Sequence, residues 1–544
     1  MCAKDNPDAS TPSAEGDNTA GVTGRGLLRS TSIVSGMTLM SRVLGLVRDI
    51  VIARYFGVSV ATDAFFTANR IPNMLRRFFA EGAFSQGFVP VMGRYRERHS
   101  HTEAKVLIDA VAGTFGLALF VVTLIGVVAA PLLVALVAPG FIGDNGRFDL
   151  ATLMLRFTFP YLLFVSLTAF AGGILNTFGK FGAPAFTPVI LNVVLIAFTI
   201  VVAPGLQEPG MALAYGVFFA GLVQLLFQLP FLARIKAIPR PRWRPGHEGV
   251  RRIGRLMVPA IFGSSVAQIN VLIGGVIASL LGVGKISLLY YSDRLMEFPL
   301  GLFGIALATV TLPTLSRQHA AGSTDGFTRT LDWSMKLIVL IATPSAVGLI
   351  VLAEPLVATL FYGGEFDGTD VQLTALSLQA FAVGLVGFSF VKILAPAYFA
   401  REDTRTPVRV AVVALVVNAV LSVLLAYWLT QIGYAGTHAG LALAVSIAAL
   451  LNAGLLYRGL RREGIIQPAA GWRMLLFRVV VANVLMSVCL SAITQPVDWW
   501  LDASLANRAG SLALLVCVGI VAYFAALFVL GLRLHMLRLS AADP

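Results

Sequence analysis

Apolar runs long enough to cross a lipid bilayer recur along the chain from residue 29 to residue 532. A helix that spans the hydrocarbon core needs about 20 mostly apolar residues. Polar or glycine-rich segments separate the runs, so the pattern predicts an all-α polytopic membrane protein with about fourteen transmembrane helices. The predicted spans are residues 29–56, 61–92, 106–138, 150–177, 184–204, 211–233, 253–281, 285–315, 334–361, 371–399, 408–430, 437–457, 474–494 and 511–532.

Basic and non-basic loops alternate between these spans. Lys and Arg gather in one set, whereas the intervening set is neutral or acidic. Cytoplasmic loops carry an excess of Lys and Arg, so the basic set is expected to be cytoplasmic. An even number of crossings then places both termini in the cytoplasm. The basic loops are residues 94–105, 176–182, 234–255, 400–409 and 457–464, and the others include residues 138–149, 203–210, 361–370 and 495–510.

Composition agrees with a membrane protein and excludes several other classes. The chain is 57% hydrophobic and 13% charged, with a mean hydropathy of +0.82. Its net charge of +13 follows the loop alternation and so reports topology rather than nucleic-acid binding. The three cysteines and six histidines lack metal-site spacing, and no GxxxxGK[ST] segment is present. We therefore expect a transporter rather than an enzyme, with no cofactor, driven by the membrane potential or an ion gradient.

The basic segment 234–255 divides the chain into two halves that repeat each other faintly. Lobes related by a repeat enclose the binding site in many alternating-access transporters, so a central cavity is expected between two six-helix lobes. The matching residues are Ala53, Gly57, Val58, Arg70, Pro90 and Arg94 in the first half and Ala278, Gly282, Val283, Arg294, Pro313 and Arg317 in the second. The predicted organisation is a disordered cytoplasmic tail at 1–26, an N-terminal lobe at 27–245 with helices 1–6, a C-terminal lobe at 246–462 with helices 7–12, and two extra helices at 463–544.

The first predicted span is too charged for a helix that faces lipid. Its segment SRVLGLVRDIVIARYFG, residues 41–57, contains Arg42, Arg48, Asp49 and Arg54. A charged side chain at the centre of a membrane helix costs about 2.5 to 3.5 kcal/mol on insertion scales. These side chains are therefore expected to face protein or water. Arg54 is the exception, because it is near the helix end and can extend to the interface.

Two other predicted spans contain similar charges in apolar surroundings. The second and eighth spans both interrupt their apolar runs with arginines and carboxylates, and the second adds an asparagine. These residues are Asp63, Arg70, Asn73, Arg76, Arg77 and Glu81 in the second span and Asp293, Arg294 and Glu297 in the eighth.

The intramembrane charges admit two interpretations. For the carboxylates, internal ion pairs and a functional role are equally good explanations. The arginines, however, exceed the carboxylates that lie near them in sequence. A guanidinium stays protonated and binds phosphate through two parallel hydrogen bonds, so the surplus predicts an anion-binding cavity. The arginines in question are Arg42, Arg48, Arg76 and Arg294.

Four segments of the chain resemble the signature segments of one transporter family. They are SRVLGLVRD, ATDAFF, IPNMLRRFFAEGAFSQGFVP and YYSDRLMEFPLGLFGIALATVTLPTLSR. With these segments the chain is similar to the MurJ (MviN) family of lipid II flippases, part of the multidrug/oligosaccharidyl-lipid/polysaccharide exporter superfamily. The resemblance implies a bacterial inner-membrane flippase that moves the undecaprenyl-pyrophosphate-linked peptidoglycan precursor from the inner to the outer leaflet for cell wall synthesis.

The resemblance also implies roles for individual residues and partners. It places the four arginines named above in the central cavity as substrate contacts. Its last two helices would form a groove for the lipid tail, although plain membrane helices fit the sequence equally well. The implied partners are lipid II, membrane lipids and the peptidoglycan synthesis machinery, without nucleic acid. Supporting or gating roles are implied for Ser41, Asp49, Asp63, Asn73, Glu81, Ser287, Asp293 and Glu297.

Two other functions fit the predicted fold. One is an exporter of another polyprenyl-linked glycan or of a drug within the same superfamily; an exporter of cationic drugs would be expected to have surplus carboxylates in its cavity. The other is a non-transporting membrane scaffold, which would tolerate the substitution Arg76→Ala.

Overall fold

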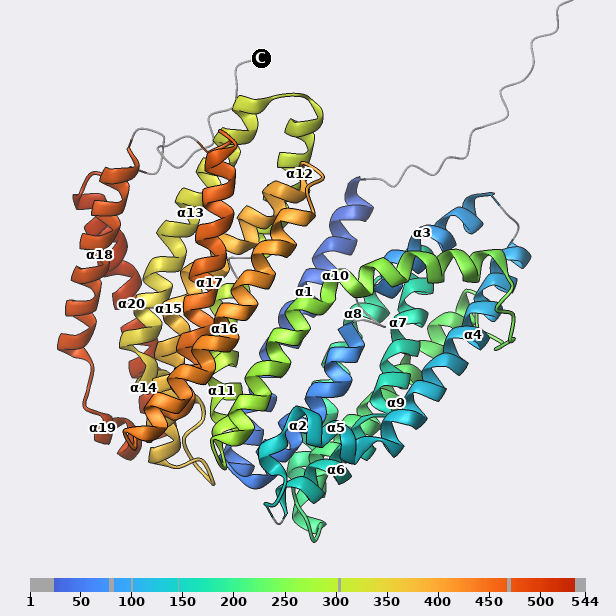
Figure 1. The fold of residues 1–544 in the computed structure, drawn as a ribbon, viewed down its shortest axis with the longest axis horizontal. Coiled ribbons are helices and arrows are strands. Elements are labelled where there is room, and N and C mark those ends of the chain that lie inside the picture. The colour runs from blue at the N-terminus through green and yellow to red at the C-terminus, as the bar shows by residue number, and fades with distance from the viewer. Residues whose placement is uncertain are drawn as a thin grey trace, which may run out of the picture.

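The structure is a computed structural model that describes residues 24–77, 83–98, 101–144, 146–301, 305–466 and 471–533. These residues form α-helices joined by turns and by short 3-10 and π segments (Figure 1). Most of the predicted tail at 1–26 lies outside the described residues. The helices are α1 (Gly24–Phe56), α2 (Val60–Arg76), α3 (Ala83–Arg98), α4 (His101–Val128), α5 (Ala130–Val137), α6 (Arg147–Thr158), α7 (Tyr161–Thr177), α8 (Gly182–Ala197), α9 (Met211–Arg234), α10 (Glu248–Leu280), α11 (Lys285–Pro299), α12 (Ile305–Ala320), α13 (Thr324–Val351), α14 (Ala353–Leu360), α15 (Gly368–Phe399), α16 (Arg405–Gln431), α17 (Thr437–Arg462), α18 (Trp472–Ile493), α19 (Val497–Asp502) and α20 (Leu505–Val529).

Within the described residues, ten helical segments are long and apolar enough to cross a membrane. They coincide with ten of the predicted spans, and the prediction of an all-α polytopic membrane protein is confirmed. The other four predicted spans correspond to α1, the pair α2 and α3, α10, and the pair α11 and α12. Three of these four contain the intramembrane charges, which lower their apolar character. The count of fourteen crossings stays a prediction.

The helices form two groups that share a core at one end only. In Figure 1, α2 to α9 lie on one side and α11 to α20 on the other, with α1 and α10 between them. Helix α1 packs on α8, so we count it with the first group. One buried cluster crosses both groups near the end of α1 and includes Ile52, Phe66 and Tyr291. Away from that end each group has its own cluster, one around Phe88 and one around Tyr398. We call the end with the shared core the closed end.

Glycines allow the backbones of the two groups to touch at the closed end. Gly57 follows α1 with φ +59°, and a Cβ at this position would overlap the backbone of Glu365. The Glu365 N–H donates to the Arg54 carbonyl at 2.9 Å. Gly140 packs in the same way against Ser279, whose hydroxyl accepts the Gly140 N–H at 3.1 Å. A larger side chain at Gly57 would push the Glu365 backbone away from α1, and one at Gly140 would push away the end of α10.

The predicted repeat is visible in the local structure of both halves. A glycine with positive φ, Gly57 or Gly282, lies between the first two helices of each half. A proline lies within the third helical segment of each half, α3 or α12, and the arginine four residues later donates its Nε–H to that proline's carbonyl. The distances are 3.3 Å for Arg94 and 3.4 Å for Arg317. The halves therefore share backbone features that their weak sequence similarity only suggests.

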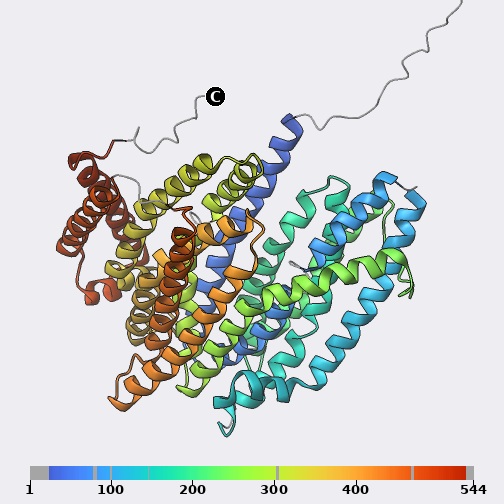
Figure 2. The ribbon, with the colours of Figure 1, turned by 45° about the horizontal axis from the view of Figure 1, so that its top comes forward.

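Helix α10 contacts both groups, because it packs on α3 and on α16. The boundary predicted at residues 245 and 246 stays a prediction. At the far edge of the molecule, α18 and α20 pack on each other and α18 packs on α13 (Figure 2). This pair lies outside the repeated part of the chain.

Candidate functional site

Three helices bring a cluster of polar side chains together where the two groups meet. Arg48 and Asp49 come from α1, Asn192 from α8, and Tyr290 and Arg294 from α11. We call these five residues the junction cluster. Asp49 is 2% exposed, and Arg48 has a side-chain exposure of 12%. The first predicted span therefore turns its central charges toward protein, as the insertion cost requires.

All three guanidinium nitrogens of Arg48 have partners. Its Nε and Nη2 donate to Asp49 Oδ1 at 3.0 and 2.6 Å. Its Nη1 donates to Asn192 Oδ1 at 3.1 Å, and its Nη2 also reaches the Tyr290 hydroxyl at 3.2 Å. Asn192 is itself fixed, since its Nδ2 donates to the Ser41 carbonyl at 3.0 Å. The arginine is held as part of a satisfied network, the condition under which a buried charge is tolerated.

Arg294 shares the same carboxylate but is more accessible. Its Nε lies 3.4 Å from Asp49 Oδ2, and its Nη1 lies 3.2 Å from Glu297 Oε2. The Arg294 side chain is 39% exposed and that of Glu297 is 50% exposed. Asp49 therefore stands between two arginines, and the outer arginine has a face open to a ligand.

The remaining predicted arginines of the site, Arg42 and Arg76, lie on α1 and α2. Arg42 is exposed on α1, about 9 Å along the helix from Arg48. Its guanidinium lies beside Gly301, just after α11. Arg76 is half-buried and ends α2. Arg42 thus also lies between the two groups.

Asp293 has several charged neighbours around α11. Arg70, Arg77, Arg294 and Glu297 all interact with it electrostatically. The Arg70 guanidinium also fills the space beside a glycine of α10, Gly275. The charges predicted from spans two and eight are therefore brought together.

A second polar cluster joins α2 to the start of α11 at the closed end. Asp63 is fully buried and accepts hydrogen bonds from the Gly284 N–H at 2.6 Å, the Ser287 N–H at 2.9 Å and the Ser287 hydroxyl at 2.7 Å. The Thr62 hydroxyl oxygen lies 2.9 Å from the same Ser287 hydroxyl. A carboxylate at a helix N-terminus satisfies free N–H groups and opposes the positive end of the helix dipole. We call Thr62, Asp63, Gly284 and Ser287 the cap cluster.

Arg54 has a different environment from the one the sequence predicted. It does not simply extend to the interface: its Nη2 donates to the carbonyls of Thr359 and Leu360 at 3.3 and 3.1 Å. Those carbonyls end α14, and Arg508 of α20 donates to the preceding carbonyl, that of Ala358, at 3.0 Å. Two guanidinium groups from different parts of the chain therefore cap one helix C-terminus, where cations are favoured.

Comparison with known proteins identifies the family. The family model described as "Lipid II flippase MurJ" matches residues 52–510, which is most of the chain. The chain belongs to the MurJ family. A relative in Vibrio cholerae, "Probable lipid II flippase MurJ", is 46% identical over 519 residues, covering 94% of this chain and 98% of the relative. "Lipid II flippase MurJ" of Burkholderia cenocepacia is 41% identical over 520 residues, covering 95% and 99%.

Solved structures agree with membership of the MurJ family. "Lipid II flippase MurJ, inward closed conformation" matches with a TM-score of 0.74 and 26% identity, covering 91% of this chain and 97% of that one. An inward-facing multidrug resistance MATE family transporter of the MOP superfamily matches with a TM-score of 0.62 at 15% identity, covering 80% and 98%. The second match shows a shared fold alone. The predicted family is confirmed, and the predicted superfamily stays a prediction.

In this MurJ family member, the structure brings only some of the predicted site residues together. It joins Arg48, Asp49, Arg294 and Glu297 directly, and Ser41 joins them through its carbonyl. Asp63 and Ser287 form a separate cluster at the closed end. Glu81 lies outside the described residues, and Asn73 is half-buried on α2. The substrate contacts themselves stay a prediction.

Sequence reasoning missed two members of the junction cluster, Asn192 and Tyr290. Asn192 is one amide in the apolar run of span five and has no charged neighbour in sequence. Tyr290 lies in the quoted segment YYSDRLMEFP and four residues before Arg294, a spacing that places both on one helix face. That spacing was the available signal for Tyr290.

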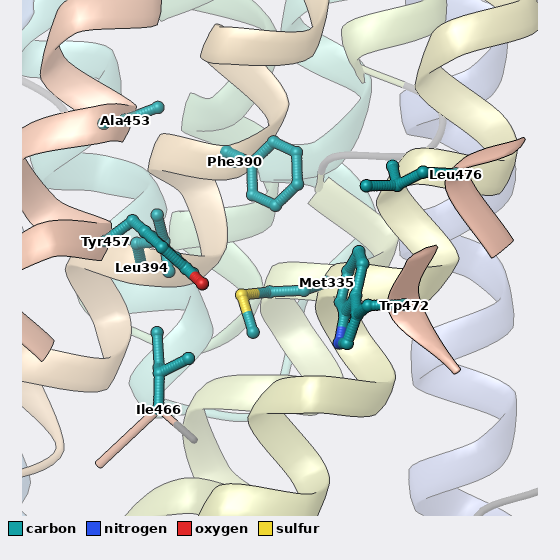
Figure 3. A pocket seen from close by; sticks show the side chains of 9 residues that line it. Met335, Phe390, Leu394, Ala453, Tyr457, Ile466, Trp472 and Leu476 are labelled. Carbon is teal, nitrogen blue, oxygen red and sulfur yellow. The ribbon is translucent and has the colours of Figure 1, made fainter. Parts of the chain in front are cut away.

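The C-terminal part of this MurJ family member also contains an apolar groove. It has a volume of about 620 Å³ and lies between α13, α15 and α18, with Val339, Phe390 and Val484 in its lining. A neighbouring pocket shares Phe390, Trp472 and Leu476 with it and extends toward Tyr457 (Figure 3). The shared lining residues show that the two hollows adjoin.

Proposed function

We propose that this lipid II flippase moves its substrate from the inner to the outer leaflet of the cytoplasmic membrane by alternating access. The substrate is expected to be the undecaprenyl-pyrophosphate-linked peptidoglycan precursor. Family membership supports lipid II as the substrate class, and the geometry of the two lobes supports the mechanism. The headgroup is large and anionic, so unassisted passage through hydrocarbon is prohibitive.

The observation that carries the proposal is the excess of guanidinium groups at the junction. Asp49 and Glu297 balance Arg48 and Arg294. Counting also Asp293 with its neighbours Arg70 and Arg77, and Arg42 beside Gly301, these described residues comprise five arginines and three carboxylates, a net charge of +2. A diphosphate offers several anionic oxygens to planar guanidinium forks. We infer that Arg294, with its exposed face, meets the diphosphate first, and that Arg42, Arg48 and Arg76 contribute further contacts.

Alternating access explains why the two groups share only one core. The loops at 138–149, 203–210 and 361–370 lie at the closed end and are the neutral or acidic ones. The charge pattern therefore supports a periplasmic position for the closed end and cytoplasmic termini. In this arrangement the separate cores lie toward the cytoplasm, and the substrate enters between the lobes from that side.

The polyprenyl tail needs only an apolar surface beside the lobes. We propose that helices α18 and α20 and the groove against α13 accommodate it while the headgroup crosses between the lobes. Most of the groove's lining residues are apolar, which suits a hydrocarbon chain. We further propose an inner-membrane location, transport driven by the membrane potential or an ion gradient, and a working association with the peptidoglycan synthesis machinery.

Transport can be tested with the full-length protein in liposomes that contain lipid II. An externally added enzyme that modifies the lipid II headgroup should gain access to inner-leaflet lipid II only when the protein is present. Unchanged access would refute the proposed function. Substituting Arg294 with Ala should abolish most transport and Lys should restore part of it, because Lys keeps the charge and loses the fork. Arg156→Ala, an exposed arginine of α6, serves as the control.

A further inference from the structure

The Tyr290 hydroxyl lies at the centre of the junction cluster. It accepts hydrogen bonds from Arg48 Nη2 and from Arg294 Nε and Nη2, each at 3.2 Å. It donates to Asp49 Oδ1, also at 3.2 Å. A phenol has one donor and two acceptor sites, so this hydroxyl is fully used when the two Arg294 nitrogens share one acceptor site and Arg48 takes the other.

Tyr290 also links the two groups of helices. It belongs to α11, whereas Arg48 and Asp49 belong to α1 and Phe66 belongs to α2. The Tyr290 ring stacks on Phe66 with 3.8 Å between centroids. Two of its hydrogen bonds, those with Arg48 and Asp49, cross from one group to the other. Separation of α1 from α11 would break both of them.

We propose that Tyr290 is a lock residue: its hydroxyl holds α1 against α11 while the site is empty, and an anionic headgroup releases it by taking over the N–H groups of Arg48 and Arg294. This inference rests on the proposed function for the identity of the anion. In this proposal, Tyr290 transmits substrate binding at the junction cluster to the closed end. Neither the charge pattern nor the family resemblance assigns Tyr290 this role.

Competition for N–H groups explains how binding could favour opening. In the empty site the arginine nitrogens that face Asp49 and Tyr290 are already occupied. A diphosphate must therefore displace these partners before it gains its own bonds. Once it has done so, the two bonds that cross the junction are absent and the closed end is less stable. A ligand shifts a conformational equilibrium only through such differential interactions.

The adjacent tyrosine supplies a matched control. Tyr291 is on the same helix and is fully buried, but its hydroxyl has no hydrogen-bond partner among the described residues. Tyr290→Phe and Tyr291→Phe each remove one oxygen and keep the ring. Tyr290→Phe also keeps the stack on Phe66. A general effect of losing a buried phenol should appear in both variants, whereas loss of the lock should appear only in the first.

The lock can be tested by measuring the distance across the closed end. Spin labels would be attached to cysteines at Gln207 and Thr369, which are exposed on the two sides of that end, after replacement of Cys2, Cys489 and Cys517. Without lipid II, Tyr290→Phe should raise the ratio of separated to closed populations about tenfold, because the loss of a hydrogen bond to a charged group shifts an equilibrium by roughly that factor. Tyr291→Phe should resemble the parent protein.

The same measurement is then repeated with lipid II. Lipid II should lengthen the distance between the two spin labels in the parent protein and in Tyr291→Phe, and have little further effect in Tyr290→Phe. By reciprocity, lipid II should bind Tyr290→Phe more tightly by a similar factor. An Asp49→Asn substitution should add little to Tyr290→Phe, because both act on one network.

The outcomes separate the lock from the proposed function. If Tyr290→Phe remains closed without lipid II, as the parent does, the lock is refuted even when transport is intact. If both tyrosine variants separate equally, the hydroxyl of Tyr290 has no special role and the lock is again refuted. If the parent fails to transport lipid II, the proposed function fails, while the substrate-free comparison still decides whether Tyr290 holds the lobes together.

Discussion

Substituting Asp63 with Asn should open the closed end. Asp63 Oδ1 accepts both bonds from Ser287, and Oδ2 accepts the Gly284 N–H at 2.6 Å. Asparagine can keep the Ser287 bonds through its amide oxygen, but its NH₂ group then faces the Gly284 N–H. One buried donor is left unsatisfied, at a cost of about 1 to 3 kcal/mol. The negative charge opposite the α11 dipole is also lost, for about 0.3 to 1 kcal/mol.

These losses sum to about 1.3 to 4 kcal/mol. At 1.4 kcal/mol per tenfold change, the ratio of separated to closed populations should rise about 10- to 700-fold. The spin-label pair at Gln207 and Thr369 measures this ratio directly in liposomes without substrate. Asp149→Asn is the control, because Asp149 is an exposed acid in the first turn of α6. A distance distribution in Asp63→Asn equal to that of the control would show that the cap cluster does not hold the lobes.

Three further perturbations test other parts of the structure. Arg54→Ala should weaken closure about tenfold by removing the bonds to the Thr359 and Leu360 carbonyls, as measured by the same label pair, whereas an effect no larger than that of Arg156→Ala would contradict this contact. Val484→Trp should obstruct the groove and slow transport of full-length lipid II more than that of a short-chain analogue, while Val416→Trp, an exposed position on α16 and outside the groove lining, should leave the two rates unchanged; equal slowing of both substrates by Val484→Trp would argue against tail binding there. The hydrogen bonds from Thr406 and the Arg405 N–H hold the pKa of Asp403 below its ordinary value of 3.8, so their stabilisation is complete above that pH and is lost as the pH falls through the lower folded value. Asp403→Asn should therefore speed amide exchange in the first turn of α16 at pH 7, with a difference from the parent that disappears in acid; a difference independent of pH would contradict the assignment.

The sequence predicts the helices well because lipid imposes a strong length and hydropathy requirement on each span. It also identifies Arg48, Asp49 and Arg294 as unusual, since each is expensive in an apolar helix. It fails for Tyr290 and Asn192, which are inexpensive in such helices and acquire their roles only through neighbours 241 and 144 residues away in the chain. Arg54 shows a related failure, because only the fold reveals that α14 ends beside it.

The pairing around Asp49 also bears on which ligand can act on the junction. Its two oxygens face different arginines: Oδ1 accepts from Arg48 Nη2 at 2.6 Å and from the Tyr290 hydroxyl at 3.2 Å, and Oδ2 lies 3.4 Å from Arg294 Nε. A ligand that replaces this carboxylate must therefore present at least two acceptor oxygens with comparable negative charge, or Arg48 loses its counter-ion and Arg294 is left to Glu297. A neutral sugar fails this requirement, whereas a diphosphate meets it with oxygens on two phosphorus atoms. The headgroup sugars and peptide can then contribute fit, but the diphosphate is the part of lipid II that can release α1 from α11.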